Sequence, residues 1–216
     1  MTVSEQRSFG GVPTRFWDRV GSRYDRQLWL ERASVRTLLA RAAPRADERL
    51  LDVGTGTGAV LRYLASRPQR PREAIGVDRS PPMLARVPAL PAGWSAVQAD
   101  ARRLPFEDEA FDVVTASYLL HVLSERDLSA VLGELRRVLR RDGRLAVLTP
   151  SIPPGRSLRP VARALDRLAQ RRPGRFGGLR ALDPRTQLVS AGFDVAGVDH
   201  SLRGYPSICV LARPAR

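Results

Sequence analysis

Hydrophobic and polar positions along this chain alternate between two periods. Short apolar runs have the length of buried strands, and they lie at 50–53, 74–77, 94–98, 112–116, 144–148, 193–198 and 207–213. Stretches with apolar residues every three or four positions have the period of helices, and they lie at 14–24, 31–42, 59–66, 81–86, 124–139, 158–169 and 184–191. Apolar strands separated by amphipathic helices predict an α/β fold, with a parallel sheet covered on both faces.

Local signals set the expected ends of several helices. Ser80 followed by Pro81 is typical of a helix entry, and Ser124 with Asp127 three residues later resembles a capping box. The apolar stripe that starts at Leu128 runs to Leu139, and Gly143 then predicts the C-terminal stop of that helix. Pro44 closes the second N-terminal helix.

The most informative stretch is the glycine-rich turn after the first strand, Leu50-Leu51-Asp52-Val53-Gly54-Thr55-Gly56-Thr57-Gly58. Glycines tolerate positive φ and have no Cβ atom to keep a ligand away from the main chain. A strand, a glycine turn and a helix N-terminus together predict a nucleotide-type site at the carboxyl end of a parallel strand.

The identity of the nucleotide depends on the acids nearby. Gly54, Gly56 and Ala59 satisfy the dinucleotide fingerprint, and an acid follows at Asp78, so an NAD-dependent dehydrogenase is one alternative. However, Asp52 precedes the glycines, where it would repel a pyrophosphate and attract a cation. With Asp78 and Asp100, three acids end three successive strands, which suits a ligand with an ammonium group, a ribose and an adenine amine but no phosphate.

This pattern resembles the class I S-adenosylmethionine-dependent methyltransferases. Within that family the chain is similar to the small-molecule branch of ubiquinone/menaquinone C-methyltransferases and phospholipid N-methyltransferases. The matching motifs, in order, are Leu51-Asp52-Val53-Gly54-x-Gly56-x-Gly58, Gly76-Val77-Asp78-x-Ser80, Gln98-Ala99-Asp100-Ala101, Phe111-Asp112-Val113-Val114 and Leu135-x-x-Val138-Leu139-x-x-Asp142-Gly143-x-Leu145. The usual Pro-Gly-Gly turn is replaced here by Asp142-Gly143, which should alter a loop rather than the chemistry.

The resemblance implies a Rossmann-like, doubly wound and mostly parallel seven-stranded sheet with an antiparallel last strand. It also implies an N-terminal helical cap over residues 1–45, before a methyltransferase domain over 46–216 that contains a basic helical insertion at 151–182. The implied activity is methyl transfer from S-adenosyl-L-methionine to a small-molecule or lipid-like acceptor by in-line displacement. An enzyme of this kind must hold donor and acceptor in contact and exclude water.

The same resemblance assigns roles to individual residues. Asp52 and the Gly54–Gly58 turn would hold the amino acid end of the cofactor, Asp78 the ribose and Asp100 the adenine amine. The full set implied to bind the cofactor is Asp52, Gly54, Thr55, Gly56, Thr57, Gly58, Asp78, Arg79, Met83, Asp100, Ala101 and Ser117.

Each of these residues also has a structural interpretation. The acids could be helix caps or turn residues, and Met83 could simply fill the core. His121 and Tyr24 are the catalytic candidates, with a buried structural His and an aromatic packing contact as the alternatives, and His200 is a further candidate base. Two distant His residues and one Cys offer no metal-ligand cluster.

The chain is strongly basic, and much of its excess charge lies in one segment. The net charge is +14, its basic residues are all Arg, and residues 151–182 carry eight Arg against one Asp. In that segment Arg159, Arg163, Arg167 and Arg171 form a stripe along a predicted amphipathic helix. The segment could reflect compositional bias, form part of a substrate wall for an apolar or anionic small molecule, or rest on an anionic membrane.

A nucleic-acid methyltransferase or RNA-binding protein is the alternative function that such a charge raises. Ser117-Tyr118-Leu119-Leu120 lacks the Asn/Asp-Pro-Pro-aromatic signature of enzymes that methylate nucleobase amines, which argues against it. A non-enzymatic cofactor-binding scaffold is a third alternative. The sequence has no long apolar run and a single cysteine, Cys209, so we expect a soluble cytoplasmic protein, and its oligomeric state is left open.

Overall fold

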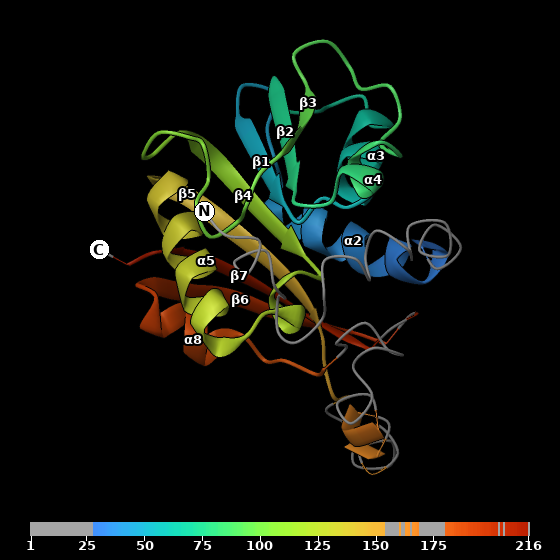
Figure 1. Ribbon diagram of the computed structural model, residues 1–216, viewed down its shortest axis with the longest axis vertical. Helices are drawn as coiled ribbons and strands as arrows, with labels where there is room; N and C mark the ends of the chain where they lie inside the picture. Colours follow the sequence, from blue (N-terminus) through green and yellow to red (C-terminus); the bar gives the residue numbers. More distant parts are fainter. Residues whose placement is uncertain are drawn as a thin grey trace, which may run out of the picture.

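A computed structural model describes residues 28–153, 160, 163–164, 166–168, 180–202, 204 and 206–215 of the 216. These residues form one seven-stranded sheet in the order β3-β2-β1-β4-β5-β7-β6 (Figure 1). Strands β1 to β5 pair in parallel, and β7 is antiparallel to both β5 and β6. The strands are β1 Arg49–Val53, β2 Glu73–Asp78, β3 Ser95–Gln98, β4 Phe111–Ser117, β5 Leu139–Pro150, β6 Phe193–Ser201 and β7 Ser207–Pro214.

Helices cover both faces of the sheet. Figure 1 shows α2, α3 and α4 on one face and α5 and α8 on the other. Two separate hydrophobic clusters correspond to these layers, one containing the apolar stripe of α5 and the other joining α2 to α3. The doubly wound sheet with its antiparallel last strand is therefore confirmed. The helices are α2 Leu28–Ala42, α3 Ala59–Ala65, α4 Pro81–Leu84, the 3-10 turn η2 Leu120–Val122, α5 Glu125–Val138 and α8 Arg185–Ser190.

The start of α5 follows its sequence signal and its end does not. The Ser124 hydroxyl accepts a hydrogen bond from the Asp127 N–H at 3.1 Å, as the capping pattern predicts. Gly143 was expected to stop this helix, but the prediction was wrong, because α5 ends at Val138 and Gly143 lies inside β5. Leu139 already pairs with Phe111 of β4, so sheet pairing takes over before the helical stripe ends. A Cβ on Gly143 would lie 2.9 Å from the Asp112 carbonyl oxygen, which explains the glycine there.

Arg144 of β5 joins the C-terminal end of helix α2 to the sheet and forms a buried ion pair with Glu48. The Arg144 guanidinium contacts both Glu48 carboxylate oxygens, at 2.9 and 2.7 Å, and also donates to the carbonyls of Ala42 and Ala43. Glu48 is only 3% exposed, so its charge depends on these donors. Burial alone would raise the Glu48 pKa, but the hydrogen bonds from Arg144 and Arg45 hold it below its usual value.

Arg144→Met is expected to lower the free energy of unfolding by about 3 kcal/mol, because it leaves a buried carboxylate short of its main counter-charge. Urea titration followed by circular dichroism measures this. Arg141→Met is the matched control, because Arg141 is an exposed arginine on the same strand that pairs with the exposed Glu109, and its midpoint should match wild type. Equal midpoints for the two variants would contradict this account of how α2 is held.

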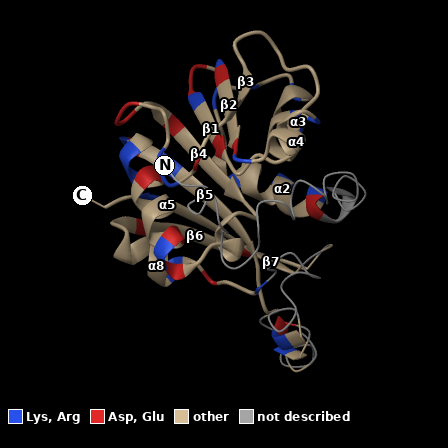
Figure 2. Ribbon diagram, in the orientation of Figure 1, with Lys and Arg blue, Asp and Glu red and all other residues tan. Residues whose placement is uncertain are grey.

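The segment after β5 leaves the sheet and returns to it at one place. The Leu182 N–H donates to the Pro150 carbonyl at 2.9 Å, and the Thr149 hydroxyl donates to the Leu182 carbonyl at 2.7 Å. Between these ends the described residues 160, 163–164 and 166–168 are helical and project away from the sheet in Figures 1 and 2.

Part of the predicted basic helix lies among the described residues. Arg163 and Arg167 are exposed, whereas Arg159 and Arg171 lie outside the described residues. The predicted helix at 14–24 and Tyr24 also lie outside them. In the part of the chain that the structure describes, no helix is both long and apolar enough to cross a bilayer.

Candidate functional site

The glycine turn between β1 and α3 places bare main chain at the carboxyl edge of the sheet. Gly54, Gly56 and Gly58 have φ values of +73°, +55° and +84°, a region that other residues rarely adopt. The N–H groups of Gly54 and Thr55 donate to the Val77 carbonyl at 2.9 Å, which fixes the turn against β2. A Cβ at Gly54 would meet Leu119 at 3.1 Å, whereas one at Gly56 would meet no atom within 4 Å. Gly56 therefore borders open space.

Asp78, the last residue of β2, organises this turn. One carboxylate oxygen accepts from the Gly56 N–H at 2.8 Å, and the other accepts from the Ser80 N–H at 2.9 Å. The residue is partly exposed, so its carboxylate also faces the space beside Gly56. A carboxylate can accept about four hydrogen bonds, so Asp78 can hold the turn and accept from a ligand as well.

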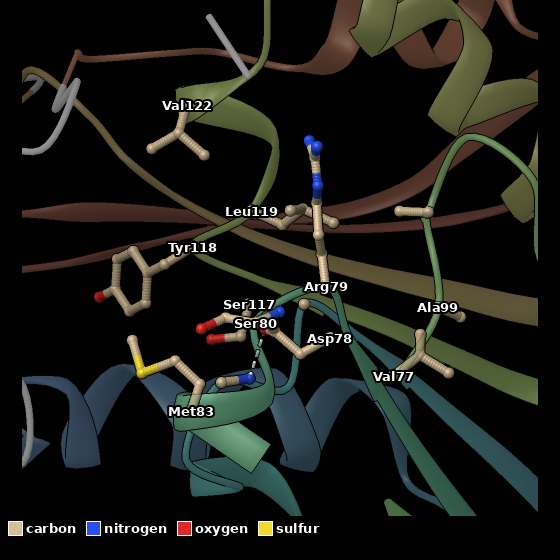
Figure 3. A pocket seen from close by; sticks show the side chains of 13 residues that line it. Val77, Asp78, Arg79, Ser80, Met83, Ala99, Ser117, Tyr118, Leu119 and Val122 are labelled. Atoms are coloured by element: carbon tan, nitrogen blue, oxygen red, sulfur yellow. Dashed lines mark hydrogen bonds between the residues drawn. The ribbon is translucent and has the colours of Figure 1, made fainter. Parts of the chain in front are cut away.

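An open cavity lies beside Asp78, with about 800 Å³ of space between its atoms when its mouth is included. Figure 3 shows Met83, Ser117 and Asp78 around it. The lining residues are Gly54, Gly56, Val77, Asp78, Arg79, Ser80, Met83, Ala99, Ala101, Ser117, Tyr118, Leu119 and Val122.

The cavity brings together seven of the residues expected to bind cofactor: Gly54, Gly56, Asp78, Arg79, Met83, Ala101 and Ser117. Tyr118, Leu119 and Val122 were not among the expected site residues. The signal that could have found them is their position directly after β4, the strand beside β1, where the strand order reverses and ligands of such sheets bind.

Asp52 does not line the cavity. It is 1% exposed, and one carboxylate oxygen accepts from the Thr115 hydroxyl at 2.7 Å. Burial raises the Asp52 pKa to about 6; the Thr115 hydrogen bond opposes this and the nearby charge of Asp78 adds to it. Its side chain thus lies within the sheet, behind the glycine turn rather than at its surface.

Thr55, Thr57 and Gly58 are also outside the lining. The hydroxyls of Thr55 and Thr57 are buried. The Thr55 hydroxyl interacts with the Asp52 carboxylate and lowers its pKa, whereas the Thr57 hydroxyl has no hydrogen-bond partner among the described residues. Gly58 is the N-cap of α3. The glycine turn thus covers two buried hydroxyls and a buried carboxylate, an unusually polar interior that a cationic or hydrogen-bonding ligand group could complement.

The Asp100 carboxylate forms an ion pair with the nearby Arg102. The Arg102 guanidinium donates to it at 2.6 Å, and the same arginine reaches Asp127 at 3.1 Å. Partial burial would raise the Asp100 pKa, but the hydrogen bonds from Arg102 lower it overall. Asp100 does not line the cavity, whereas its neighbours Ala99 and Ala101 do.

Neither described histidine lines the cavity. His121 is 4% exposed, and burial, with a smaller contribution from the Arg180 charge, lowers its pKa to about 3. It is therefore neutral at physiological pH, and its Nδ1 has no partner among the described residues. His200 is exposed on β6. No group of three or more His, Cys, Asp or Glu in the described part of the chain could hold a metal ion.

Comparison with known proteins finds a family whose pattern matches part of this chain. Residues 51–147, which contain the glycine turn, Asp78 and β4, match the family described as Methyltransferase domain. The matched segment contains every residue that lines the cavity.

Several curated relatives with named activities are similar to part of this chain. A demethylmenaquinone methyltransferase of Roseiflexus castenholzii is 38% identical over 147 residues, which are 64% of this chain and 60% of the relative. The ubiquinone/menaquinone biosynthesis C-methyltransferase UbiE of Dinoroseobacter shibae is 36% identical over 159 residues, 68% of this chain and 62% of the relative. The chain therefore spans about three fifths of the length of these relatives.

Among solved structures, a SAM-dependent methyltransferase from Aquifex aeolicus superposes with a TM-score of 0.61 at 19% identity. The match covers 84% of this chain and 89% of that one. This similarity concerns the fold.

The residues present fit S-adenosylmethionine. Gly56 borders open space where a side chain would stand, and the Asp78 carboxylate at the end of β2 can accept from ribose hydroxyls. The buried Asp52 carboxylate provides negative charge behind the turn, which suits an ammonium group better than a pyrophosphate. Ala99 and Ala101 leave room for a flat ring beside their main chain.

Proposed function

We propose that this protein transfers a methyl group from S-adenosylmethionine to a small, ring-bearing and partly apolar acceptor. The observation that carries the proposal is the cavity itself, in which Asp78 and the bare main chain at Gly56 adjoin an apolar wall. That wall comes from Leu119, Val122 and Met83. Relatives named for quinone biosynthesis support a reduced quinone or a similar hydroxylated ring as the acceptor.

When bound, the cofactor would supply an electrophilic methyl group on a sulfonium. The chain's own contribution is to bind and orient. Asp78 holds the glycine turn and would accept from the ribose, while Ala99 and Ala101 would line the adenine. Leu119 and Val122 exclude water from the acceptor side, which favours a displacement between two bound molecules.

A protein base is not needed for every acceptor of this class, because a phenolate is already a nucleophile. His121 stays a predicted base. Its neutral imidazole could accept a proton, but the low pKa means that it would hold that proton weakly. The base role therefore requires that acceptor binding bring His121 into contact with the reacting group.

We also propose a lipid-like tail on the acceptor and contact of the basic segment with an anionic membrane. These two features would go together, since Arg163 and Arg167 are exposed beside the exposed Leu168. We also propose a cytoplasmic location. It is supported by the single cysteine, Cys209, which is buried and has its pKa raised to about 12 mainly by that burial.

The direct test uses S-adenosylmethionine carrying a deuterated methyl group. Purified protein is incubated with it and with 1,4-dihydroxynaphthalene under reducing conditions, and products are analysed by mass spectrometry. The expected product carries one deuterated methyl group and forms in equal amount with S-adenosylhomocysteine. Formation of neither product, across a panel of hydroxylated naphthalenes and benzenes, would contradict the proposal.

A further inference from the structure

Tyr118 has an uncommon backbone conformation at the end of the cavity. It follows the last residue of β4 and has a φ of +53°. For a residue with a Cβ atom this left-handed conformation costs about 1–2 kcal/mol. Among the described residues other than glycine, Ala43 and Glu109 also have positive φ, but neither lines the cavity. The strain at Tyr118 therefore lies at the candidate site.

Two neighbouring strands hold Tyr118 in that conformation. Its N–H donates to the Leu148 carbonyl of β5 at 2.8 Å. Its phenol oxygen lies 2.8 Å from the hydroxyl of Ser207, the first residue of β7. The ring also meets the buried His121 ring edge to face, with the centroids 6.2 Å apart. The position of the phenol is thus determined by β5, β7 and η2 together.

The ring of Tyr118 lies with the apolar side chains of the cavity. In Figure 3 it lies at the same end as Met83 and Val122, away from Val77 and Ala99 at the other end. Tyrosine offers an apolar ring for contact and a hydroxyl for a directed hydrogen bond. A flat acceptor with an oxygen substituent matches both parts.

We propose that Tyr118 positions the methyl acceptor. Its ring packs against the ring of the acceptor, and its hydroxyl hydrogen-bonds an oxygen on that ring. Ser207 orients the Tyr118 hydroxyl from β7 and acts through it. The acceptor class is then a planar ring that carries a hydroxyl or keto oxygen. This inference rests on the proposed methyl transfer and adds the residue that selects the acceptor.

The test compares Tyr118→Phe with wild type. This change removes one oxygen and keeps the ring. The KM for 1,4-dihydroxynaphthalene is expected to rise about tenfold, the value of one hydrogen bond of ordinary strength. The dissociation constant for S-adenosylhomocysteine should stay within about twofold of wild type. The thermal midpoint should stay within about 2 °C of wild type. Ser207→Ala removes the hydroxyl that orients Tyr118 and should raise the same KM by a smaller factor. Ser207→Thr keeps a hydroxyl at this position, so its KM should be that of wild type.

Tyr63→Phe is the matched control, since Tyr63 belongs to α3 and does not line this cavity. It should leave all three quantities unchanged.

Three results would overturn the inference. The first is an unchanged KM in Tyr118→Phe. The second is a loss of S-adenosylhomocysteine affinity in parallel with the loss of acceptor affinity, which a merely structural role would produce. The third is no binding of 1,4-dihydroxynaphthalene to the wild-type complex with S-adenosylhomocysteine. The proposed cofactor role fails separately, if wild type does not bind S-adenosylhomocysteine at all.

Discussion

Asp78→Asn weakens S-adenosylhomocysteine binding by about 100-fold, if Asp78 acts as its contacts indicate. The carboxylate accepts from the N–H groups of Gly56 and Ser80 and would accept from the ribose hydroxyls too. Hydrogen bonds to a charged acceptor are worth about 1.5–3 kcal/mol each, so losing the charge loosens both the turn and the ligand. Isothermal titration calorimetry measures the change.

Asp142→Asn is the control for that experiment, because Asp142 lies on β5 and its side chain is 83% exposed. It should bind S-adenosylhomocysteine as wild type does. Thermal midpoints of both variants separate a loss of binding from a loss of folding. If Asp78→Asn folds normally and binds within threefold of wild type, Asp78 is a turn residue and not a ligand.

Asp52→Asn is expected to change stability and binding in opposite directions. The Asp52 pKa is raised to about 6 in the folded protein from an ordinary value of 3.8, so the folded state binds the extra proton between these values. Stability from this group therefore falls as pH rises from about 4 to 6, and the penalty is complete above pH 6. A shift of this size corresponds to about 3 kcal/mol. At pH 7.5 the neutral Asn should recover much of this lost free energy of unfolding.

The same Asp52→Asn change should weaken cofactor binding while it stabilises the fold. If the buried charge of Asp52 attracts the ammonium group of the cofactor, Asp52→Asn should weaken S-adenosylhomocysteine binding about tenfold at pH 7.5. In wild type the affinity should rise between pH 5 and 7 as Asp52 ionises, and in the variant it should not. Urea denaturation and calorimetry at pH 5, 6 and 7.5 measure both effects. A variant less stable than wild type at pH 7.5, with unchanged binding, would contradict this role.

Much of the fold could be predicted from the sequence, because buried strands and amphipathic helices carry different periods. The misplaced end of α5 shows the limit of this reasoning. Leu139 continues the apolar stripe of the helix, but it pairs with Phe111 of β4 in the sheet. An apolar residue satisfies either environment, so periodicity alone does not say where a helix ends and a strand begins.

The three acids show what sequence predicts about the site and what it does not. All three follow or end strand-like runs, yet only Asp78 faces the cavity. Asp52 lies one residue before the end of β1 and is bound by Thr115 of the adjacent β4, a contact across 63 residues that no local pattern announces. Asp100 has its counter-charge two residues away in Arg102, which the sequence does show.

Tyr118 was missed for a different reason. Its place in the site depends on a left-handed backbone and on a partner 89 residues away, Ser207. Positive φ is expected of glycine and not of tyrosine. The residue type therefore gives no hint of the conformation, which the pairing of β4, β5 and β7 imposes.

The most direct test of the whole account is a calorimetric titration of the purified protein with S-adenosylhomocysteine, with NAD titrated in parallel. The account predicts one-to-one binding of S-adenosylhomocysteine in the micromolar range and no heat from NAD, because a buried acid behind the glycine turn disfavours a pyrophosphate. Binding of NAD, or no binding of S-adenosylhomocysteine at millimolar concentration, would contradict it.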